Sequence, residues 1–468
     1  MLSKLALIMG ATLLPPHVTA GTVEEPLSSG YGPENVTQYS GYISVNEAKG
    51  NDGHLFFWMF ESRTAPAEAP LVLWLTGGPG CSSELAIFYE QGPYRLDKAG
   101  DITINEHSWN SIANVLFVDQ PVGTGFSFAD NNDAYVKNEK QVAEDMWEFM
   151  QAFLARFPQY AKGELYVTGE SYAGHYVPAI SSRIVAGNKK LSQGEVELNL
   201  KGFAIGNGLV DPQNQYTQYV PYAQAHSLIG SKTAMVMNAT TKACVAAIKK
   251  GHAGMGTMGM CNSIIEGIQL AGGGFNQYDV RQKCHKPPLC YDFDALSALL
   301  LKPETQASLG VKANVGKHWK SCNMAVHMKM LNDWFADLEL VIPDILASGV
   351  RMLVYSGQED FICNWFGGRD WVSKMVWPGQ AAYNKHPWAE WTVDDVTAGV
   401  YKEHGNVQFQ GVANAGHMVP MDQPANALAM LHIFLEGRSL GCPTIVDKYG
   451  VHNGRDFVGC GNVSSGGK

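Results

Sequence analysis

Ser171 stands at a sharp turn of the chain that would expose its hydroxyl group for nucleophilic chemistry. Residues 165–167 are apolar and β-prone, Gly169 permits a tight turn, and residues 172–180 suit a helix. A serine between a strand and a helix forms a nucleophile elbow, which needs small neighbours because the strand and the helix nearly collide. The spacing is Gly-x-Ser-x-Ala, with Ala173 in place of the commoner second glycine. The alternative interpretation is an ordinary strand-to-helix turn with a capping serine.

A serine nucleophile requires a general base and a carboxylate that orients the base, and both residue types follow later apolar runs. One run leads into a loop with Glu359 and Asp360, and another leads into a loop that ends at His417. In α/β-hydrolases the triad partners follow the serine in the order carboxylate, then histidine. Ser171, Asp360 and His417 have this order. Glu359 competes with Asp360 for the acid role, and the spacing does not exclude it.

A glycine-rich loop at residues 76–80 follows a further apolar run and is suited to stabilise an oxyanion. Its sequence is Thr-Gly-Gly-Pro-Gly, and glycine lets backbone N–H groups approach a ligand closely. A loop from this region of such hydrolases donates one N–H of the oxyanion hole, and the residue after the nucleophile, here Tyr172, donates the other. The alternative is an ordinary glycine–proline turn. A phosphate-binding P-loop is excluded because no Gly-Lys-Ser/Thr sequence follows.

The elements that must position these residues are strands and helices in alternation. Residues 21–50 are polar and glycine-rich and are predicted to lead into the fold, and residues 139–157 have the apolar spacing of a helix. Strands are predicted in the run that begins at Leu165 and at residues 56–60, 71–75, 113–118, 203–205, 352–355 and 409–412. This alternation predicts an α/β fold with a mostly parallel central sheet flanked by helices.

The alternation stops between about residues 211 and 331. This stretch contains five of the nine cysteines, and residues 251–260 are rich in glycine and methionine. We interpret it as a largely helical insertion that is held by disulfide bonds and covers the C-terminal edge of the sheet. The predicted organisation is a single catalytic domain at residues 21–440 that contains this insertion, followed by a C-terminal extension at residues 441–468.

Residues 1–20 predict a secretory signal peptide, because a charged start and an apolar run precede small residues at a cleavage site. The run is too short to span a bilayer, and no later stretch is long enough, so no membrane span is predicted. The mature protein is therefore expected in the secretory pathway, in a lysosome or vacuole, or outside the cell. Acceptor sequons for glycans stand at Asn35, Asn238 and Asn462.

Charge and cysteine spacing exclude several classes of protein. The net charge of −10 argues against nucleic acid or an anionic membrane as the main partner. No two cysteines have the C-x-x-C spacing, so the sequence suggests neither a zinc site nor thioredoxin-type chemistry. We therefore predict no metal and no cofactor. Nine is an odd number, so at least one cysteine is unpaired or pairs elsewhere.

Five motifs together resemble those of the serine carboxypeptidases. They occupy residues 74–83, 119–127, 169–174, 360–364 and 416–420, in this order along the chain. The resemblance extends from about residue 41 to residue 435. It implies an α/β-hydrolase fold with a helical insertion, and an enzyme that releases the C-terminal residues of peptides and proteins one at a time through an acyl-enzyme.

The same resemblance assigns roles to individual residues. It implies that Ser171 is the nucleophile, His417 the general base and Asp360 the orienting acid. It also implies oxyanion-hole N–H groups and a site for the terminal carboxylate of the substrate. The oxyanion-hole residues are Gly78 and Tyr172, and the carboxylate-binding residues are Thr76, Gly77, Glu90 and Glu170.

Two of the carboxylate-binding positions have consequences of their own. Thr76 replaces the commoner asparagine of the family, and a hydroxyl offers one donor hydrogen where an amide offers two. Glu90 and Glu170 can bind a carboxylate only if they share a proton, because two ionised glutamates would repel it. Crowding of like charges raises the apparent pKa of such a pair. We therefore expect binding of peptide acids to be favoured at acidic pH.

The resemblance also implies the covalent framework. The implied disulfide bonds are Cys81–Cys322, Cys244–Cys261 and Cys284–Cys290. Cys363 would be a free thiol near the site. Cys442 and Cys460 lie beyond the matched region and could pair with each other.

Two other functions remain open at this stage. Some relatives of the family are acyltransferases, and another esterase activity on the same fold is a related alternative. A comparison of a blocked dipeptide with a glucose ester would separate these from a peptidase. A catalytically inactive partner protein would require a broken triad, and the triad is complete. The sequence leaves open the oligomeric state, for which a homodimer is one alternative. It also leaves open which side chains the enzyme prefers at the last two residues of the substrate.

Overall fold

The computed structural model describes residues 21–24, 30–46, 50, 52–252, 254–447 and 450–453. The predicted signal peptide at residues 1–20, the sequon at Asn462 and the cysteine at position 460 lie outside the described residues.

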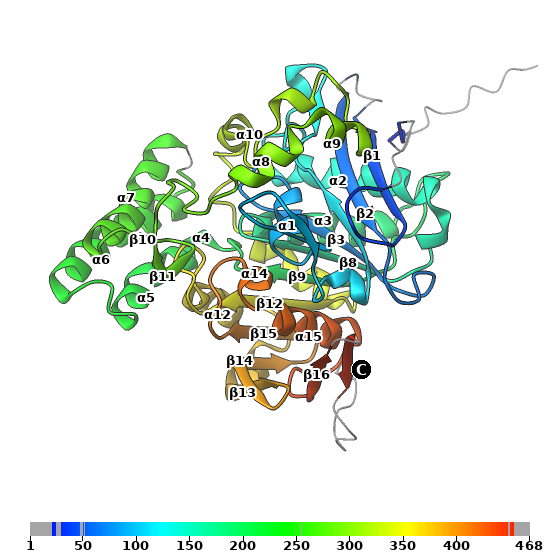
Figure 1. The fold of residues 1–468 in the computed structure, drawn as a ribbon. Helices are drawn as coiled ribbons and strands as arrows, with labels where there is room; N and C mark the ends of the chain where they lie inside the picture. Colours follow the sequence, from blue (N-terminus) through cyan, green and yellow to red (C-terminus); the bar gives the residue numbers. More distant parts are fainter. Residues whose placement is uncertain are drawn as a thin grey trace, which may run out of the picture.

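A mixed sheet of eleven strands forms the centre of the described chain (Figure 1). The strands are β1 (Gln38–Val45), β2 (Gly53–Phe60), β3 (Leu71–Thr76), β6 (Asn114–Val118), β7 (Phe128–Ala129), β8 (Leu165–Glu170), β9 (Leu200–Gly206), β12 (Arg351–Gly357), β13 (Ala389–Val393), β14 (Val396–His404) and β15 (Val407–Val412). The middle of the sheet is parallel, in the order β6-β3-β8-β9-β12-β15, and antiparallel strands extend it at both ends. The predicted α/β fold is confirmed.

The buried parallel strands are apolar on both faces because helices cover both sides of the sheet. Along β3, Leu71, Leu73 and Leu75 enter one core, whereas Val72 and Trp74 enter the other. The first core is completed by α2 (Glu139–Arg156), α3 (Ala173–Asn188), α11 (Ile342–Ala347) and α12 (Trp365–Lys374). The second is completed by α1 (Glu84–Tyr89), α8 (Asp294–Leu300) and α15 (Pro424–Leu435).

The region predicted as an insertion is mostly helical and lies in two places. Its elements are α4 (Pro212–Gln215), α5 (Tyr219–Ala225), α6 (Ser231–Lys249), α7 (Met255–Ala271), the hairpin β10 (Phe275–Asn276) and β11 (Asp279–Lys283), then α8, α9 (Pro303–Ser308) and α10 (Met324–Lys329). Figure 1 shows α5, α6, α7 and the hairpin projecting from one side of the sheet, whereas α8, α9 and α10 lie nearer β1. The first group has its own small core, which includes Ile264, Ile268 and Phe361.

Two parts of the sheet differ from the prediction. Residues 21–50 were expected only to lead into the fold, but they contain β1, which pairs antiparallel with all of β2. Residues 389–404 form β13 and β14, which no prediction covered. Both lie at the edges of the sheet, where serine, glycine, threonine and lysine interrupt the apolar pattern. The described chain also contains β4 (Tyr94–Leu96), β5 (Ile102–Ile104), α13 (Gln380–Lys385), α14 (Val419–Asp422), β16 (Thr444–Asp447) and β17 (Gly450–Asn453).

Candidate active site

Ser171 occupies a strained turn between β8 and α3. Its φ angle is +68°, a left-handed conformation that non-glycine residues rarely adopt. The turn is fixed by its carbonyl oxygen, which accepts hydrogen bonds from the N–H of Gly174 at 2.9 Å and of Leu209 at 3.0 Å. Gly169 must be small, because a Cβ there would lie 2.5 Å from the Leu75 carbonyl oxygen and 2.7 Å from the Ala173 Cβ. These contacts give the geometry of a nucleophile elbow.

His417 and Asp360 meet beside this elbow. The Nδ1 atom of His417 lies 2.9 Å from Oδ2 of Asp360, and both side chains are buried. Asp360 follows β12 and His417 follows β15, two neighbouring parallel strands. The carboxyl ends of parallel strands lie on the same edge of a sheet, so residues far apart in the sequence come together here. Asp360, rather than Glu359, is the carboxylate in contact with the histidine.

The Asp360 carboxylate is held by a complete set of donors. Oδ2 accepts hydrogen bonds from Asn207 Nδ2 at 2.8 Å and from the N–H of Cys363 at 3.2 Å, and Oδ1 accepts from the N–H of Ile362 at 3.1 Å. These donors fix the position of the carboxylate beside His417. Asn207 was missed in the sequence, although it directly follows β9 at the same edge of the sheet.

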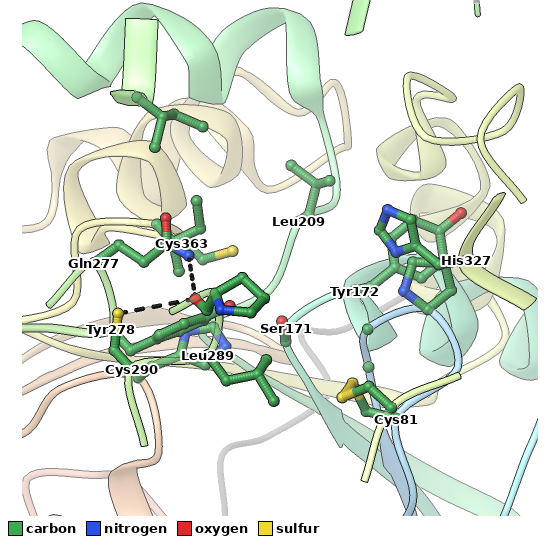
Figure 2. Close-up of a pocket in the computed structure, with 18 of the residues that line it drawn as sticks. Cys81, Ser171, Tyr172, Leu209, Gln277, Tyr278, Leu289, Cys290, His327 and Cys363 are labelled. Atoms are coloured by element: carbon green, nitrogen blue, oxygen red, sulfur yellow. Dashed lines mark hydrogen bonds between the residues drawn. A yellow bond between two sulfur atoms is a disulfide. The ribbon is translucent and has the colours of Figure 1, made fainter. Parts of the chain in front are cut away.

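A cavity of about 700 Å³ opens onto these residues. Its walls include Ser171 and His417, while Asp360 lies behind the histidine. Figure 2 shows Ser171 between Tyr172 and His327 on one side and Gln277 and Tyr278 on the other. The remaining residues that the sequence predicted for oxyanion and carboxylate binding line the same cavity: Thr76, Gly77, Gly78, Glu90, Glu170 and Tyr172.

The glycine-rich loop runs directly against the elbow. A Cβ on Gly77 would lie 2.4 Å from the Tyr172 nitrogen and 2.9 Å from the Ser171 Cβ, so only glycine fits. Gly78 has a φ angle of +112°, which also requires glycine. Within the described chain, the backbone N–H groups of Gly78 and Tyr172 donate to no carbonyl oxygen. Two unused donors therefore lie beside Ser171, at the cavity wall.

Glu90 and Glu170 form a buried acid pair in the cavity wall. Their carboxyl groups are close enough to share a hydrogen bond. Burial raises the pKa of Glu90 to about 7, and burial together with the neighbouring Glu90 raises the pKa of Glu170 well above its ordinary value. Glu170 Oε1 lies 4.0 Å from Nε2 of His417. An acid pair that retains a proton near neutrality thus adjoins the histidine.

Thr76 has its hydroxyl oriented by a neighbour. Its Oγ1 accepts a hydrogen bond from the indole N–H of Trp74 at 3.0 Å. A hydroxyl that accepts through its oxygen still has one hydrogen to donate. The threonine that replaces the commoner asparagine therefore keeps one donor for a ligand in the cavity.

The β10–β11 hairpin holds both loops that carry Asp360 and His417. The carbonyl of Gln277 accepts hydrogen bonds from the N–H of Phe361 at 3.1 Å and of Ile362 at 2.9 Å. The carbonyl of Tyr278 accepts from the N–H of His417 at 2.7 Å, and the Tyr278 ring packs edge-on against the imidazole. The sequence did not reveal these residues, because nothing local to them indicates which distant loops they contact.

A side-chain network secures the hairpin to the histidine loop. Arg281 donates two hydrogen bonds of 2.8 Å to Asp279, one of 2.9 Å to the Asn414 carbonyl and one of 3.3 Å to Asp422. Asp422 in turn accepts from the N–H of Gly416 at 2.7 Å. A planar guanidinium suits this task because it presents several donors in a fixed geometry.

The cysteine pairs have the connectivity that the family resemblance implied. The disulfide bonds are Cys81–Cys322, Cys244–Cys261 and Cys284–Cys290. Cys81 directly follows the glycine-rich loop, so the Cys81–Cys322 bond ties this loop to the segment before α10. Cys442 is buried, and the expected partner Cys460 lies outside the described residues.

Cys363 is a buried free thiol that lines the cavity. Burial raises its pKa well above the ordinary value, so the reactive thiolate is suppressed. We therefore expect Cys363→Ser to keep kcat/KM for a blocked dipeptide within about threefold, whereas a bulky organomercurial inhibits the wild type and not this variant. Loss of activity in Cys363→Ser, with a normal thermal transition, would show that the Cys363 thiol takes part in catalysis rather than only occupying space in the cavity.

None of the described helices is long and apolar enough to cross a membrane. No cluster of three or more histidine, cysteine, aspartate or glutamate side chains in the described part of the chain has the arrangement of a metal site.

The chain is similar to known proteins over most of its length. The family model described as serine carboxypeptidase matches residues 29–437. Serine carboxypeptidase 3 of Hordeum vulgare is 42% identical, covering 87% of this chain and 79% of that protein, and serine carboxypeptidase-like 48 of Arabidopsis thaliana is 41% identical with the same coverage. The crystal structure of Kex1(delta)p, a prohormone-processing carboxypeptidase from Saccharomyces cerevisiae, superposes with a TM-score of 0.78 at 26% identity, covering 89% of this chain and 94% of that one.

Proposed function

This chain belongs to the serine carboxypeptidase family, and on that premise we propose that Ser171, His417 and Asp360 carry out the hydrolysis. The Ser171 hydroxyl attacks the carbonyl carbon of the last peptide bond while Nε2 of His417 accepts its proton. The same nitrogen then gives this proton to the departing amino group, and an acyl-enzyme remains on Ser171. Water, activated in the same way, releases the shortened peptide and regenerates the hydroxyl.

Asp360 and the two unused amides support these steps. The contact of 2.9 Å between Asp360 and Nδ1 keeps the proton of the neutral imidazole on Nδ1, so that Nε2 is free to act as a base. The N–H groups of Gly78 and Tyr172 would donate to the oxyanion of each tetrahedral intermediate. Donors that are already in place when charge develops are a large source of rate enhancement.

The single observation that favours removal of a C-terminal residue is the buried acid pair at Glu90 and Glu170. A protonated carboxyl group donates a hydrogen bond, and a terminal carboxylate is the group that would accept it. Thr76 and the Gly77 amide line the same wall of the cavity. A pair that holds its proton up to a pKa of about 7 for Glu90 would bind peptide acids at acidic pH and lose them as the pH rises. A carboxypeptidase acts on a peptide with a free terminal carboxylate, and this requirement separates it from an acyltransferase of the same fold.

The compartment follows as a further part of the proposal. Residues 1–20 have the pattern of a secretory signal, and the three disulfide bonds suit an oxidising route. Asn35 and Asn238 are exposed, as glycan acceptors must be. A lysosome, a vacuole or the extracellular space fits these features and the acid pair. The peptide substrates are those with a free C-terminus.

The pH dependence of substrate binding tests the proposal. Consider one blocked dipeptide as a free acid and as its C-terminal amide. Below the pKa of about 7 the pair holds a proton and the acid binds. Above it, both glutamates are ionised and repel the substrate carboxylate. We expect KM for the acid to rise about tenfold per pH unit there, the slope for one linked proton, while KM for the amide stays nearly level.

The control is the double variant Glu90→Gln/Glu170→Gln. An amide donates a hydrogen bond without titrating, so KM for the acid substrate should become nearly independent of pH. Parallel KM curves for the acid and the amide in the wild type would show that these glutamates do not recognise the terminal carboxylate. The carboxylate site would then have to lie elsewhere in the cavity.

A further inference from the structure

The cavity at Ser171 is longer than is needed to hold the two substrate residues on either side of a scissile bond. The helix α7 presents one face to it, formed by Met255, Met258, Asn262, Ile265, Glu266 and Gln269 at helical spacing. From Met255 to Gln269 the helix rises about 21 Å at about 1.5 Å per residue. Two extended residues of a substrate span only about 7 Å. This wall is therefore long enough for about six extended residues of a peptide.

The outer end of this wall is apolar and open to solvent. Met255, Met324 and Met328 line the cavity, and their exposed fractions are 67%, 59% and 48%. Met324 and Met328 lie four residues apart on α10 and so share one face of that helix. Gly254, which precedes Met255, lies against Asn332, whose Oδ1 is 3.6 Å from the position of an added Cβ. The start of α7 thus meets the segment that follows α10, and we call Met255, Met324 and Met328 the methionine strip.

The strip lies where the rest of a bound substrate would pass. A peptide with its carboxylate at Glu90 and Glu170 and its last peptide bond at Ser171 fills only the inner part of the cavity. Figure 2 places His327, the neighbour of Met328 on α10, across Ser171 from Gln277 and Tyr278. The upstream residues of the peptide therefore have the rest of the cavity available, and the same cavity reaches the methionine strip.

We propose that the methionine strip binds apolar side chains three or more residues upstream of the substrate C-terminus. This inference rests on the proposed function and names a substrate class for it: peptides of about six residues or longer with apolar residues at those positions. Methionine side chains are flexible and polarisable, so they fit differently shaped apolar partners. Exposed apolar patches of this kind typically mark binding sites. The strip would favour such peptides without demanding one particular residue.

Two acetylated hexapeptides test the proposal. They share their last two residues and carry either leucine or serine at the third and fourth positions from the C-terminus. We expect the wild type to prefer the leucine peptide in kcat/KM by about tenfold, the effect of burying about one apolar side chain. The triple variant Met255→Gln/Met324→Gln/Met328→Gln should lose this preference, because glutamine keeps the helix propensity and length but removes the apolar surface.

Two control variants separate the strip from general effects. Met235→Gln alters a methionine on α6 that is 75% exposed and does not line the cavity, so the leucine preference should remain. The triple leucine variant of the strip should also retain it, since only apolar character is required. An equal rate for both peptides in the wild type, or an undiminished preference in the triple glutamine variant, would overturn the proposal. If the wild type released no C-terminal residue from either peptide, the proposed function itself would fail instead.

Discussion

Replacement of Ser171 by alanine is expected to lower kcat by about a millionfold, the loss seen when a serine hydrolase loses its nucleophile. The remaining slow reaction would come from the oxyanion donors and from binding alone. The fold should be unaffected. Within the described chain the Ser171 hydroxyl takes part in no hydrogen bond, and it lines a cavity rather than the core. Alanine also tolerates the φ angle of +68° about as well as serine does.

The measurement combines steady-state kinetics with a covalent probe. A fluorophosphonate should label the wild type at Ser171, as identified by peptide mass mapping, and should not label Ser171→Ala. Ser182→Ala changes a serine on α3, the helix that follows Ser171, away from the cavity, and should keep both activity and labelling. Near-normal turnover in a clean Ser171→Ala preparation, or labelling at another serine, would refute the assigned nucleophile.

Replacement of Asp360 by asparagine is expected to lower kcat by about ten thousandfold. An amide at this position no longer stabilises the proton on Nδ1 of His417, so the imidazole loses the tautomer that exposes Nε2 as a base. An amide has one acceptor oxygen, so asparagine can keep only part of the four hydrogen bonds that now converge on the carboxylate, from His417, Asn207, Ile362 and Cys363. The bonds that remain should still hold the loop in place. The loss should therefore fall on kcat more than on KM.

The matched control is Glu359→Gln in the same loop. Glu359 is half-buried and does not contact the imidazole. Substitutions away from the core and from buried hydrogen-bond networks usually have small effects, so kcat should stay within about threefold of the wild type. Thermal unfolding of both variants separates a chemical effect from a loss of structure. A larger loss of kcat in Glu359→Gln than in Asp360→Asn would reverse the assignment of the acid.

The sequence was most informative where the chemistry depends on strand ends. Buried parallel strands are apolar throughout, so the runs before Ser171, Asp360 and His417 could be recognised without a structure. The order of these three residues then followed from the chain. The spacing did not choose between Asp360 and Glu359, because the side chains of adjacent loop residues differ in where they point and not in their position along the chain. The family resemblance selected Asp360. In the structure, the Asp360 carboxylate is buried among its donors, whereas Glu359 is partly exposed.

The supporting residues could not be predicted, because their contacts are distant in the sequence. Asn207 reaches Asp360 across 153 positions, and Tyr278 reaches His417 from the insertion. Arg281 looks like any surface arginine until the hairpin is placed against Asn414 and Asp422. The strand β1 was missed for a different reason. Its glycine and serine residues resemble those of a loop, and only pairing with β2 explains why they are buried.

The contacts of the β10–β11 hairpin limit how this enzyme could be recombined with its relatives. The insertion looks like an exchangeable module that could be grafted to transfer a side-chain preference. However, its Gln277 and Tyr278 carbonyls support the two loops that carry Asp360 and His417, and Gly416 must stay glycine because a Cβ there would lie 2.4 Å from the Tyr278 oxygen. A chimaera joined at residues 211 and 331 would have to inherit matching partners in both loops. The natural crossover points lie instead on either side of α6 and α7, outside the hairpin.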